Sequence, residues 1–370
     1  MHIPFCVKKC PYCDFYSTTD LSIKDRFVDA LLAEIVMADL FAFDTLYIGG
    51  GTPSVLKSRK IGQIVEAVYA KFKVQDSAEV TVEVNPGTVT YKDLKEYKAW
   101  GVNRISIGVQ SFRDRNLEFL GRIHSAKDSE IAIKNARDAG FDNISIDLIY
   151  GLDRQTKKNW VSDLERALEF NPEHISCYTL TYEPDTPMGA DVKKGRIKPL
   201  DDNITADMFE TTAFILKNAG FIHYEISNFA KSDKHRSRHN QKYWSSYPYL
   251  GFGPSAHSFM EPERYWNIKD VKEYIQKINS GIKPVEKTES LNLTQRITET
   301  IYLGLRTSDG INIVEFEDRF NINFEKEFSG IIAEFKEQGF LEIRENRCRL
   351  TLKGRLFQEG IASEFICHDF

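Results

Sequence analysis

Apolar and polar positions along the first two-thirds of the chain alternate between a strand pattern and a helix pattern. Runs rich in Val, Ile and Tyr are separated by segments whose apolar residues recur at helical spacing, as Phe27, Leu31 and Ile35 do. The predicted strands are the short segment HIPF near the N-terminus and residues 44–50, 78–84, 103–109, 143–150 and 173–180. The predicted helices are residues 22–40, 58–73, 90–99, 126–139, 157–170 and 202–219.

Repeated strand-then-helix units require parallel strands joined by right-handed crossovers. Six strands in this pattern predict an α/β fold, and specifically an open, partial (β/α)6 TIM-like barrel. A doubly wound sheet has the same local pattern and stays open as the alternative.

The remainder of the chain has a different pattern. Residues 221–289 are loop-rich and contain many His, Tyr, Trp and Pro residues. The segment from residue 290 onward predicts a mainly helical, winged-helix-like module. Its predicted elements are helices at 295–306, 312–320 and 326–338, two short strands at 340–344 and 347–352, and a closing helix. We therefore expect three regions, with boundaries at 1–220, 221–289 and 290–370.

Composition is that of a globular protein, with 42% hydrophobic and 28% charged residues among 370. The sequence has no apolar run of about 18 residues or more and no signal-peptide pattern. A cytoplasmic location is expected. The net charge of −5 gives no general attraction to nucleic acid.

Three of the six cysteines, Cys6, Cys10 and Cys13, fall within eight residues, whereas Cys177, Cys348 and Cys367 are isolated. The isolated cysteines are expected to act as small apolar residues. Three adjacent thiols cannot all pair with one another, and a long, cysteine-poor chain indicates a reducing compartment, so metal binding is favoured over disulfides. The Cys-x3-Cys-x2-Cys spacing can bring three thiolates to an iron–sulfur cluster and leave one iron open. Zinc is the alternative, although a structural zinc site normally has a fourth ligand and the nearest histidine, His2, precedes the loop.

Unusual polar and glycine residues occur where the predicted strands end, which is where parallel barrels collect their chemistry. Asp147 is the most informative of these, because a carboxylate between Ile146 and Leu148 in a buried strand is costly unless it is hydrogen-bonded. The others are the GGGTP segment at 49–53, Glu83 and Gln110. We expect them to share a ligand at the rim that also holds the cysteine loop.

The motifs HIPFCVKKCPYCDF, GGGTPS, EVNPG, RISIGVQSF, LGRIH and IDLIYGLDRQT, in this order, resemble the radical S-adenosylmethionine (radical SAM) superfamily. More narrowly, they are similar to the oxygen-independent coproporphyrinogen III oxidase group. The resemblance implies that Cys6, Cys10 and Cys13 ligate a 4Fe-4S cluster. It also implies that the open iron chelates the amino and carboxylate groups of S-adenosyl-L-methionine.

The resemblance further implies which residues contact S-adenosyl-L-methionine. Arg122 matches the position that pairs with the carboxylate, as a planar guanidinium can do in bidentate fashion. Tyr12 would lie against the adenine, and Glu83 would lie near positive charge. The remaining implied contacts are Gly50, Gly51 and Thr52 to the methionyl amino group, Gln110 and Asp147 to the ribose, and Thr181 at a less clearly aligned position.

Two subgroups share these motifs. The decarboxylating oxidases carry a further cysteine two places after the third, where this sequence has Phe15. The HemW heme chaperones carry His-Asn-x-x-Tyr-Trp, which matches HNQKYW at 239–244. This resemblance favours a chaperone, without coproporphyrinogen oxidase activity, in which His239 ligates heme iron and Tyr243 and Trp244 pack on the porphyrin. His235 and His257 remain alternative ligands, and the basic segment around HNQKYW could hold the propionates.

The expected partners are heme and an apo-hemoprotein acceptor, for which a membrane-bound respiratory enzyme is the candidate, and a homodimer is compatible with the sequence. Nucleic acid is not expected, because the segment EKEFSGIIAEFKEQ has more acidic than basic residues. A true coproporphyrinogen III oxidase and a radical SAM enzyme acting on an unrelated substrate are the alternatives.

The family resemblance also leads to an expectation about the gene. Members of this group have several residues ahead of HIPFC, including a tyrosine two places before the histidine. We therefore expect codons upstream of Met1 to encode, in frame, the rest of an apolar strand.

Overall fold

The computed structural model describes residues 1–366, so Cys367 lies outside the described residues. The chain divides into two compact units. The first unit consists of Met1–Met208, Leu250–Ser258 and Tyr265–Thr288. The second unit consists of Phe209–Tyr249, Phe259–Arg264 and the chain from Glu289 onward.

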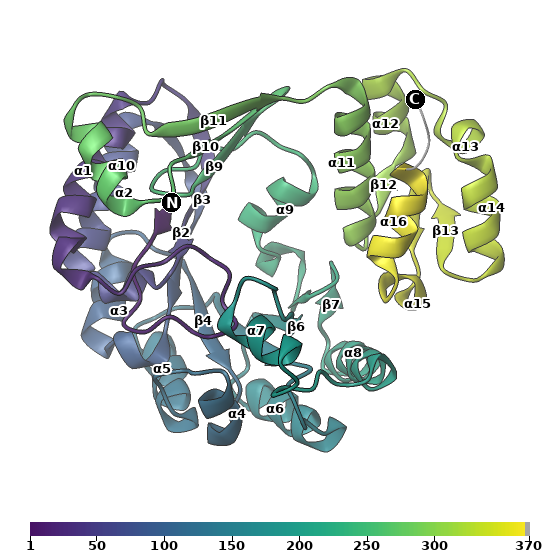
Figure 1. The fold of residues 1–370 in the computed structure, drawn as a ribbon, viewed down its shortest axis with the longest axis horizontal. Coiled ribbons are helices and arrows are strands. Elements are labelled where there is room, and N and C mark those ends of the chain that lie inside the picture. Colours follow the sequence, from purple (N-terminus) through teal and green to yellow (C-terminus); the bar gives the residue numbers. More distant parts are fainter. Residues whose placement is uncertain (367–370) are drawn as a thin grey trace. The chain divides into compact units, whose positions relative to one another are not determined.

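The first unit contains a sheet of parallel strands that follow one another in sequence order (Figure 1). These strands are β1 (His2–Ile3), β2 (Ala42–Gly50), β3 (Lys73–Val84), β4 (Arg104–Gln110), β5 (Ile144–Tyr150) and β6 (His174–Thr179). A doubly wound sheet would reverse the strand order at a switch point, whereas a barrel wall does not. With β1 at one end of the order the sheet is open, and the predicted partial barrel is confirmed.

Helices connect these strands and lie along one side of the sheet (Figure 1). They are α1 (Lys24–Met37), α2 (Ser58–Lys71), α3 (Tyr91–Ala99), α4 (Asp114–Phe119), α5 (Ala126–Asp138) and α6 (Lys157–Glu169). Thr90 and Ser125 begin α3 and α5 with capping boxes. Gly101 and Gly140 follow the same two helices with φ of 88° and 93°, which explains why glycine stands at these helix ends.

The two faces of this sheet differ in chemistry. Alternate residues such as Val82, Ile107 and Ile146 are buried and apolar. Their neighbours in the opposite phase are polar and nevertheless mostly buried: Thr81, Arg104, Ser106, Ser145, His174 and Ser176. Because successive side chains of a strand point to opposite faces, the apolar set can pack under the helices while the polar set lines the other face. That polar face also carries Glu83 and Asp147, since both alternate in phase with it.

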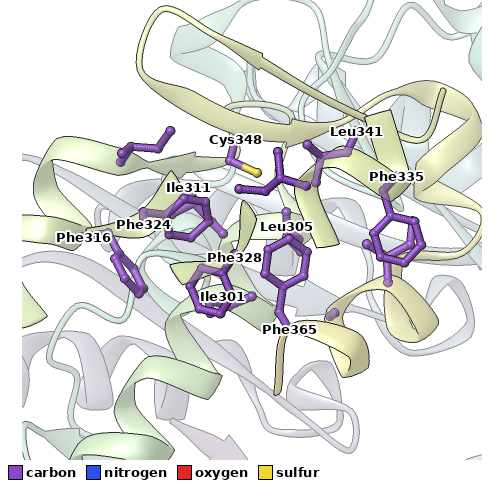
Figure 2. Close-up of a cluster of buried hydrophobic side chains, with 14 of the residues drawn as sticks. Ile301, Leu305, Ile311, Phe316, Phe324, Phe328, Phe335, Leu341, Cys348 and Phe365 are labelled. Carbon is purple, nitrogen blue, oxygen red and sulfur yellow. The ribbon is translucent and has the colours of Figure 1, made fainter. Parts of the chain in front are cut away.

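The second unit has its own core, made mostly of phenylalanine and isoleucine side chains (Figure 2). Its helices are α9 (Arg238–Trp244), α11 (Leu293–Arg306), α12 (Ile313–Phe320), α13 (Phe324–Glu327), α14 (Ser329–Glu337), α15 (Leu352–Arg355) and α16 (Gln358–Ile366), together with most of α8 (Asp202–Asn218). Its strands are β7 (Ile222–His223), β8 (Asn228–Ala230), β12 (Ile311–Asn312), β13 (Leu341–Arg344) and β14 (Arg347–Leu350). The last three form a small sheet in the order β12-β14-β13, which adds one strand to the predicted wing.

One helix prediction in the second unit was wrong. A single helix was expected over 326–338, but the chain breaks at Phe328 between α13 and α14. Phe328 has φ of −100° and ψ of 20°, is completely buried, and packs against Phe324 and Phe365. Phe324 and Phe328 are four residues apart, a spacing that also suits one face of a continuous helix, so the burial of these rings does not by itself explain the break.

The stretch predicted as loop-rich contains more structure than expected. Besides α9 it forms β9 (His257–Met260), β10 (Glu263–Asn267), α10 (Val271–Asn279) and β11 (Val285–Ser290), and α7 (Pro187–Lys193) precedes it. The three strands pair in the order β11-β10-β9. Short 3-10 turns complete the chain: η1 (Leu21–Ile23), η2 (Pro53–Val55), η3 (Pro86–Thr88) and η4 (Asp233–His235). Over residues 1–366, none of the helices combines the length and apolar character needed to cross a membrane.

Candidate functional site

The cysteine loop follows β1 and closes on itself. The Cys6 backbone N–H donates to the Thr18 carbonyl (3.0 Å), and the Thr18 N–H donates to the Pro4 carbonyl (2.7 Å). Within this loop the Cys13 N–H donates to the Cys10 carbonyl (3.1 Å). All three thiols of the loop are free and half-buried, and burial raises the pKa of Cys13. A short loop with fixed ends therefore presents three thiols without pairing them.

The glycines after β2 lie directly against this loop. Gly51 donates its N–H to the Ile3 carbonyl (2.8 Å). A Cβ on Gly51 would lie 2.8 Å from the Phe5 carbonyl oxygen and 3.1 Å from Cys6 Sγ, so a side chain there would push the cysteine loop away. The Thr52 hydroxyl donates to Cys6 Sγ at 3.5 Å. The GGGTP segment and the first cysteine are thus one packed unit.

Arg122 and Tyr12 form a second contact with the loop. Arg122 donates from Nη1 to Cys10 Sγ (3.7 Å) and from Nη2 to the Gly108 carbonyl (3.0 Å). Tyr12 is hydrogen-bonded to Arg122, and burial raises the pKa of its hydroxyl. The Tyr12 ring packs against a small apolar cluster: Leu120, Ile149, Leu152, Leu180 and Met188. The guanidinium is therefore held within reach of the cysteines from a loop more than a hundred residues away.

Two carboxylates lie on the polar face of the sheet. Glu83 accepts from the Tyr47 hydroxyl (2.7 Å) and the Gly50 N–H (3.2 Å). Asp147 accepts from serine hydroxyls on three successive strands: Ser106 (3.0 Å), Ser145 (3.3 Å) and Ser176 (2.8 Å). Burial raises the pKa of both carboxyls, and for Glu83 the charge of Asp147 adds to this effect. The hydrogen bonds expected for a buried Asp147 are therefore present.

Gln110 ends β4 in an unusual conformation. Its φ is 66°, and the pairing of β4 with β5 shifts register between Ile107 and Gln110. A Cβ added to Gly108 would lie 3.0 Å from the Gln110 amide nitrogen and 3.3 Å from Arg122 Nη2, so both side chains lie over this glycine. Thr181, in contrast, is exposed beyond the end of β6, and the structure does not place it against the other predicted contacts.

The fit of this loop to metal can be tested on the thiols themselves. Within residues 1–366, no three His, Cys, Asp or Glu side chains converge as ligands of a single metal ion. An iron–sulfur cluster takes its thiolates on separate irons, so its ligands need not converge on one ion. Three unpaired thiols on one closed loop, with Arg122 beside Cys10 and Thr52 beside Cys6, fit a cluster of that kind.

In the second unit, the segment HNQKYW forms the helix α9 rather than a loop. Ser237 caps the helix by accepting from the Asn240 N–H. His239 and Tyr243 are one turn apart and share a face, with 2.9 Å between His239 Nε2 and the Tyr243 hydroxyl and perpendicular rings at 5.0 Å. Both side chains are half-buried. The motif therefore presents an imidazole nitrogen that is already engaged by its own tyrosine.

An aromatic cavity of about 370 Å³ lies beside Tyr243, within the range of small-molecule sites. Its wall continues from Tyr243 to Tyr249, whose rings meet edge to face at 4.6 Å. The Arg264 guanidinium, paired with Glu299, is its charged part. The other lining residues are Ser246, Phe259, Thr298, Tyr302, Leu303 and Ile366. None of these residues belongs to the predicted motif.

Trp244, the last residue of the motif, is held in place by residues outside α9. The Arg306 guanidinium lies over its ring at 4.5 Å and pairs with Glu225 at 2.9 Å. The side chain of Glu225 is fully buried, and burial raises the pKa of this carboxyl. A buried charge pair therefore fixes the indole of the motif.

The alternative histidines lie on other elements. His235 ends η4, and its Nδ1 lies 3.0 Å from the Ser232 hydroxyl. His257 begins β9 in the first unit and stacks on Trp266 with 5.6 Å between ring centroids. Arg236 of the basic segment pairs with Asp233 (2.8 Å) and Asp309 (3.0 Å).

Comparison with known proteins places these features in a family. Residues 1–167 match the radical SAM superfamily model, and residues 291–357 match the HemN C-terminal domain model. The chain is 34% identical to heme chaperone HemW of Bacillus subtilis over 99% of this chain and 98% of that protein. It is also 34% identical to heme chaperone HemW of Lactococcus lactis over 100% and 97%. The chain belongs to the HemW family.

The fold of this HemW family member also matches a solved enzyme structure. Coproporphyrinogen III oxidase HemN from Escherichia coli superimposes with a TM-score of 0.85 at 26% identity, over 99% of this chain and 89% of that one. The radical SAM assignment, and with it a 4Fe-4S cluster and S-adenosyl-L-methionine as cofactors, follows from the family.

Several side chains in these sites were not anticipated from sequence. Ser106 and Ser145 could have been found, because each is a small polar residue on the same face of the sheet as Asp147. Ser145 lies on the same strand as Asp147, and Ser106 lies on the neighbouring strand. Tyr249, Tyr302 and the Glu225–Arg306 pair could not, since nothing local in the sequence connects them with α9.

Proposed function

We propose that this HemW family member is a heme chaperone that binds heme and passes it to an apo-hemoprotein. The observation that carries the proposal is the motif helix α9, which presents His239 and Tyr243 one turn apart beside an aromatic cavity. The full-length similarity to two HemW chaperones supports it.

In the first unit, Cys6, Cys10 and Cys13 would hold the 4Fe-4S cluster, which supplies an open iron for chelation when bound. Arg122 and Tyr12 would contact the carboxylate and adenine of S-adenosyl-L-methionine. Gly50, Gly51 and Thr52 lie against the cysteine loop, where an amino group could approach backbone oxygens without meeting a Cβ. On the polar face, Gln110 and Asp147 would contact the ribose, and Glu83 would lie near positive charge. Thr181 is the contact with the least support.

In the second unit, the porphyrin would lie in the aromatic cavity along Tyr243 and Tyr249. His239 Nε2 would ligate the iron once its contact with the Tyr243 hydroxyl opens. Trp244 would support the helix through its packing on Arg306. His235 and His257 are less well placed, because neither belongs to the helix that borders the cavity.

A coproporphyrinogen III oxidase is the second candidate, favoured by the structural match to HemN. Phe15 argues against this candidate, because it stands where the oxidases have a further cysteine and a phenyl ring cannot ligate iron. An anaerobic assay for protoporphyrinogen formation separates the two candidates directly, and we expect none.

The test of heme binding is a titration of the protein with heme, followed by absorbance, for wild type and His239→Ala. We expect the variant to bind at least tenfold more weakly or to show an altered Soret band, because it lacks the proposed axial nitrogen. His257→Ala is the matched control and should behave as wild type. If His257→Ala rather than His239→Ala changes the spectrum, the ligand is assigned to the wrong histidine.

The location and partners of this protein also belong to the proposal. A cytoplasmic chaperone would deliver heme to an acceptor such as a membrane-bound respiratory enzyme. Pull-down of heme-loaded protein and size-exclusion chromatography would test the acceptor and a homodimer respectively.

A further inference from the structure

A second cavity in the second unit borders the other side of the motif helix. Its volume is about 310 Å³, and Trp244 and Gln241 of the α9 helix line it. Unlike the aromatic cavity, it is lined by three arginines: Arg236, Arg319 and Arg347. Ser246, just beyond α9 and with a φ of 52°, lines both cavities, so the two adjoin at this residue.

Two of the three arginines of this guanidinium cavity are paired with carboxylates, and within the described chain the third is not. Arg236 pairs with Asp233 and Asp309, and Arg319 pairs with Glu261. Arg347, at the start of β14, is half-buried and donates to the Asp309 backbone carbonyl at 3.4 Å, and over residues 1–366 it has no carboxylate partner. Glu315 also lines the cavity, but its side chain is exposed. The half-buried positive charge of Arg347 is therefore available to an anion.

Buried donors point to the same kind of ligand. Trp244 Nε1 and Arg236 Nε are buried, and neither has an acceptor within the described chain. Both residues line this cavity. A buried N–H without a partner is unfavourable, and the group that satisfies it must be an acceptor. An ionised carboxylate is an acceptor only, and it also pairs with a guanidinium, so it fits the donors and the charge together.

We infer that the guanidinium cavity receives a propionate carboxylate of the bound porphyrin while the macrocycle lies in the aromatic cavity on the other side of Ser246. This inference rests on the proposed heme-binding function. It assigns Arg347 as the principal charge partner, with the Trp244 indole N–H as a second donor. The motif tryptophan is thereby a hydrogen-bond donor to the ligand as well as a packing residue.

The experiment compares heme with iron protoporphyrin dimethyl ester, in which both carboxylates are blocked. Wild-type protein should bind heme about ten- to a hundredfold more tightly than the ester, the range expected for a hydrogen-bonded charge in a partly buried site. Arg347→Gln should lose most of this preference by weakening heme binding while leaving the affinity for the ester unchanged. Arg344→Gln is the matched control, because Arg344 lies on the neighbouring strand β13, is 68% exposed and pairs with Glu345.

Each outcome decides a different point. If wild type binds heme and the ester equally, or if Arg347→Gln weakens both equally, the propionate assignment is wrong while heme binding stands. If wild type binds neither heme nor the ester, both the proposed function and this inference are wrong. Calorimetry with succinate gives a further outcome. If succinate binds wild type but not Arg347→Gln, and yet does not compete with heme, the cavity takes free carboxylates and the propionate assignment is again wrong.

Discussion

The candidate cofactor site in the first unit is assembled from the ends of parallel strands, whereas the candidate heme site in the second unit is assembled around one helix of seven residues. In the first unit, Gly50, Glu83 and Gln110 come from three successive strands and Asp147 from a fourth. Because these strands pair in parallel and in sequence order, their carboxyl ends lie at one edge of the sheet.

In the second unit, α9 supplies only part of the site. The walls of its aromatic cavity come from Tyr249, Phe259 and the helix α11, and its tryptophan is fixed by the pair of Glu225 and Arg306. These residues are spread over eighty positions and are not related by a repeated pattern. The first site therefore depends on topology, and the second depends on individual packing and charge contacts.

Removing one cysteine tests whether the two sites are independent, and it has the largest expected effect. Cys10→Ala should abolish the iron content and the brown colour of anoxically prepared protein, because two thiolates cannot hold a cluster that normally uses three. Heme affinity should not change, since the cysteine loop and α9 belong to different units. Iron analysis and heme titration measure the two properties separately.

The control for this variant is Cys348→Ala, which removes a buried thiol from the second core. It should leave the iron content unchanged. A loss of heme affinity in Cys10→Ala would contradict the independence of the two sites.

The pair beneath Trp244 tests whether charge contacts maintain the second site. Arg306→Ala leaves the fully buried Glu225 carboxylate without its partner, which should lower the stability of this unit by about 3–5 kcal/mol. Adding Glu225→Gln should restore part of that loss, because the neutral amide no longer needs a cation. Hydrogen exchange of α9 and α11 measures the effect locally.

Arg296, on the same helix, is the matched control. It pairs with Glu261, whose side chain is 27% exposed and keeps Arg319 as a second partner. Arg296→Ala should therefore cost only about 0–1 kcal/mol. Equal costs for Arg296→Ala and Arg306→Ala would mean that burial of the Glu225 pair has no special role.

The same difference between the two units explains how much could be predicted from sequence. The strand pattern located β2 to β6 and the helices α2, α3, α5 and α6 between them, although not the short helix α4, because alternation and helical spacing are both local signals. The need for hydrogen bonds to Asp147 could also be predicted, since a carboxylate between Ile146 and Leu148 has no other way to be buried.

The second site could be recognised from its motif but not constructed. HNQKYW was placed in a loop-rich stretch, because seven residues are too few to show a helical period. The capping residue Ser237 was the local signal available. The break at Phe328 was missed because the spacing of Phe324 and Phe328 also fits one face of a continuous helix.

Removing the contact between Tyr243 and His239 has the smallest expected effect on heme affinity, but the direction of that effect distinguishes two roles for the tyrosine. Ligation of iron by His239 Nε2 requires the 2.9 Å contact with the Tyr243 hydroxyl to open. Tyr243→Phe removes that hydroxyl and keeps the ring, so heme should bind more tightly by up to about tenfold, the worth of one ordinary hydrogen bond. Tyr249→Phe is the control, because its ring packs on Tyr243 without occupying His239.

A weakening in Tyr243→Phe comparable to that of His239→Ala would show instead that the hydroxyl itself contacts the heme. A tightening would mean that the motif tyrosine competes with iron for the histidine nitrogen. Such competition speeds the return of the empty site to its resting contacts and lowers affinity for the cargo. A protein that retains heme permanently gains nothing from it, whereas one that must hand heme to an acceptor does.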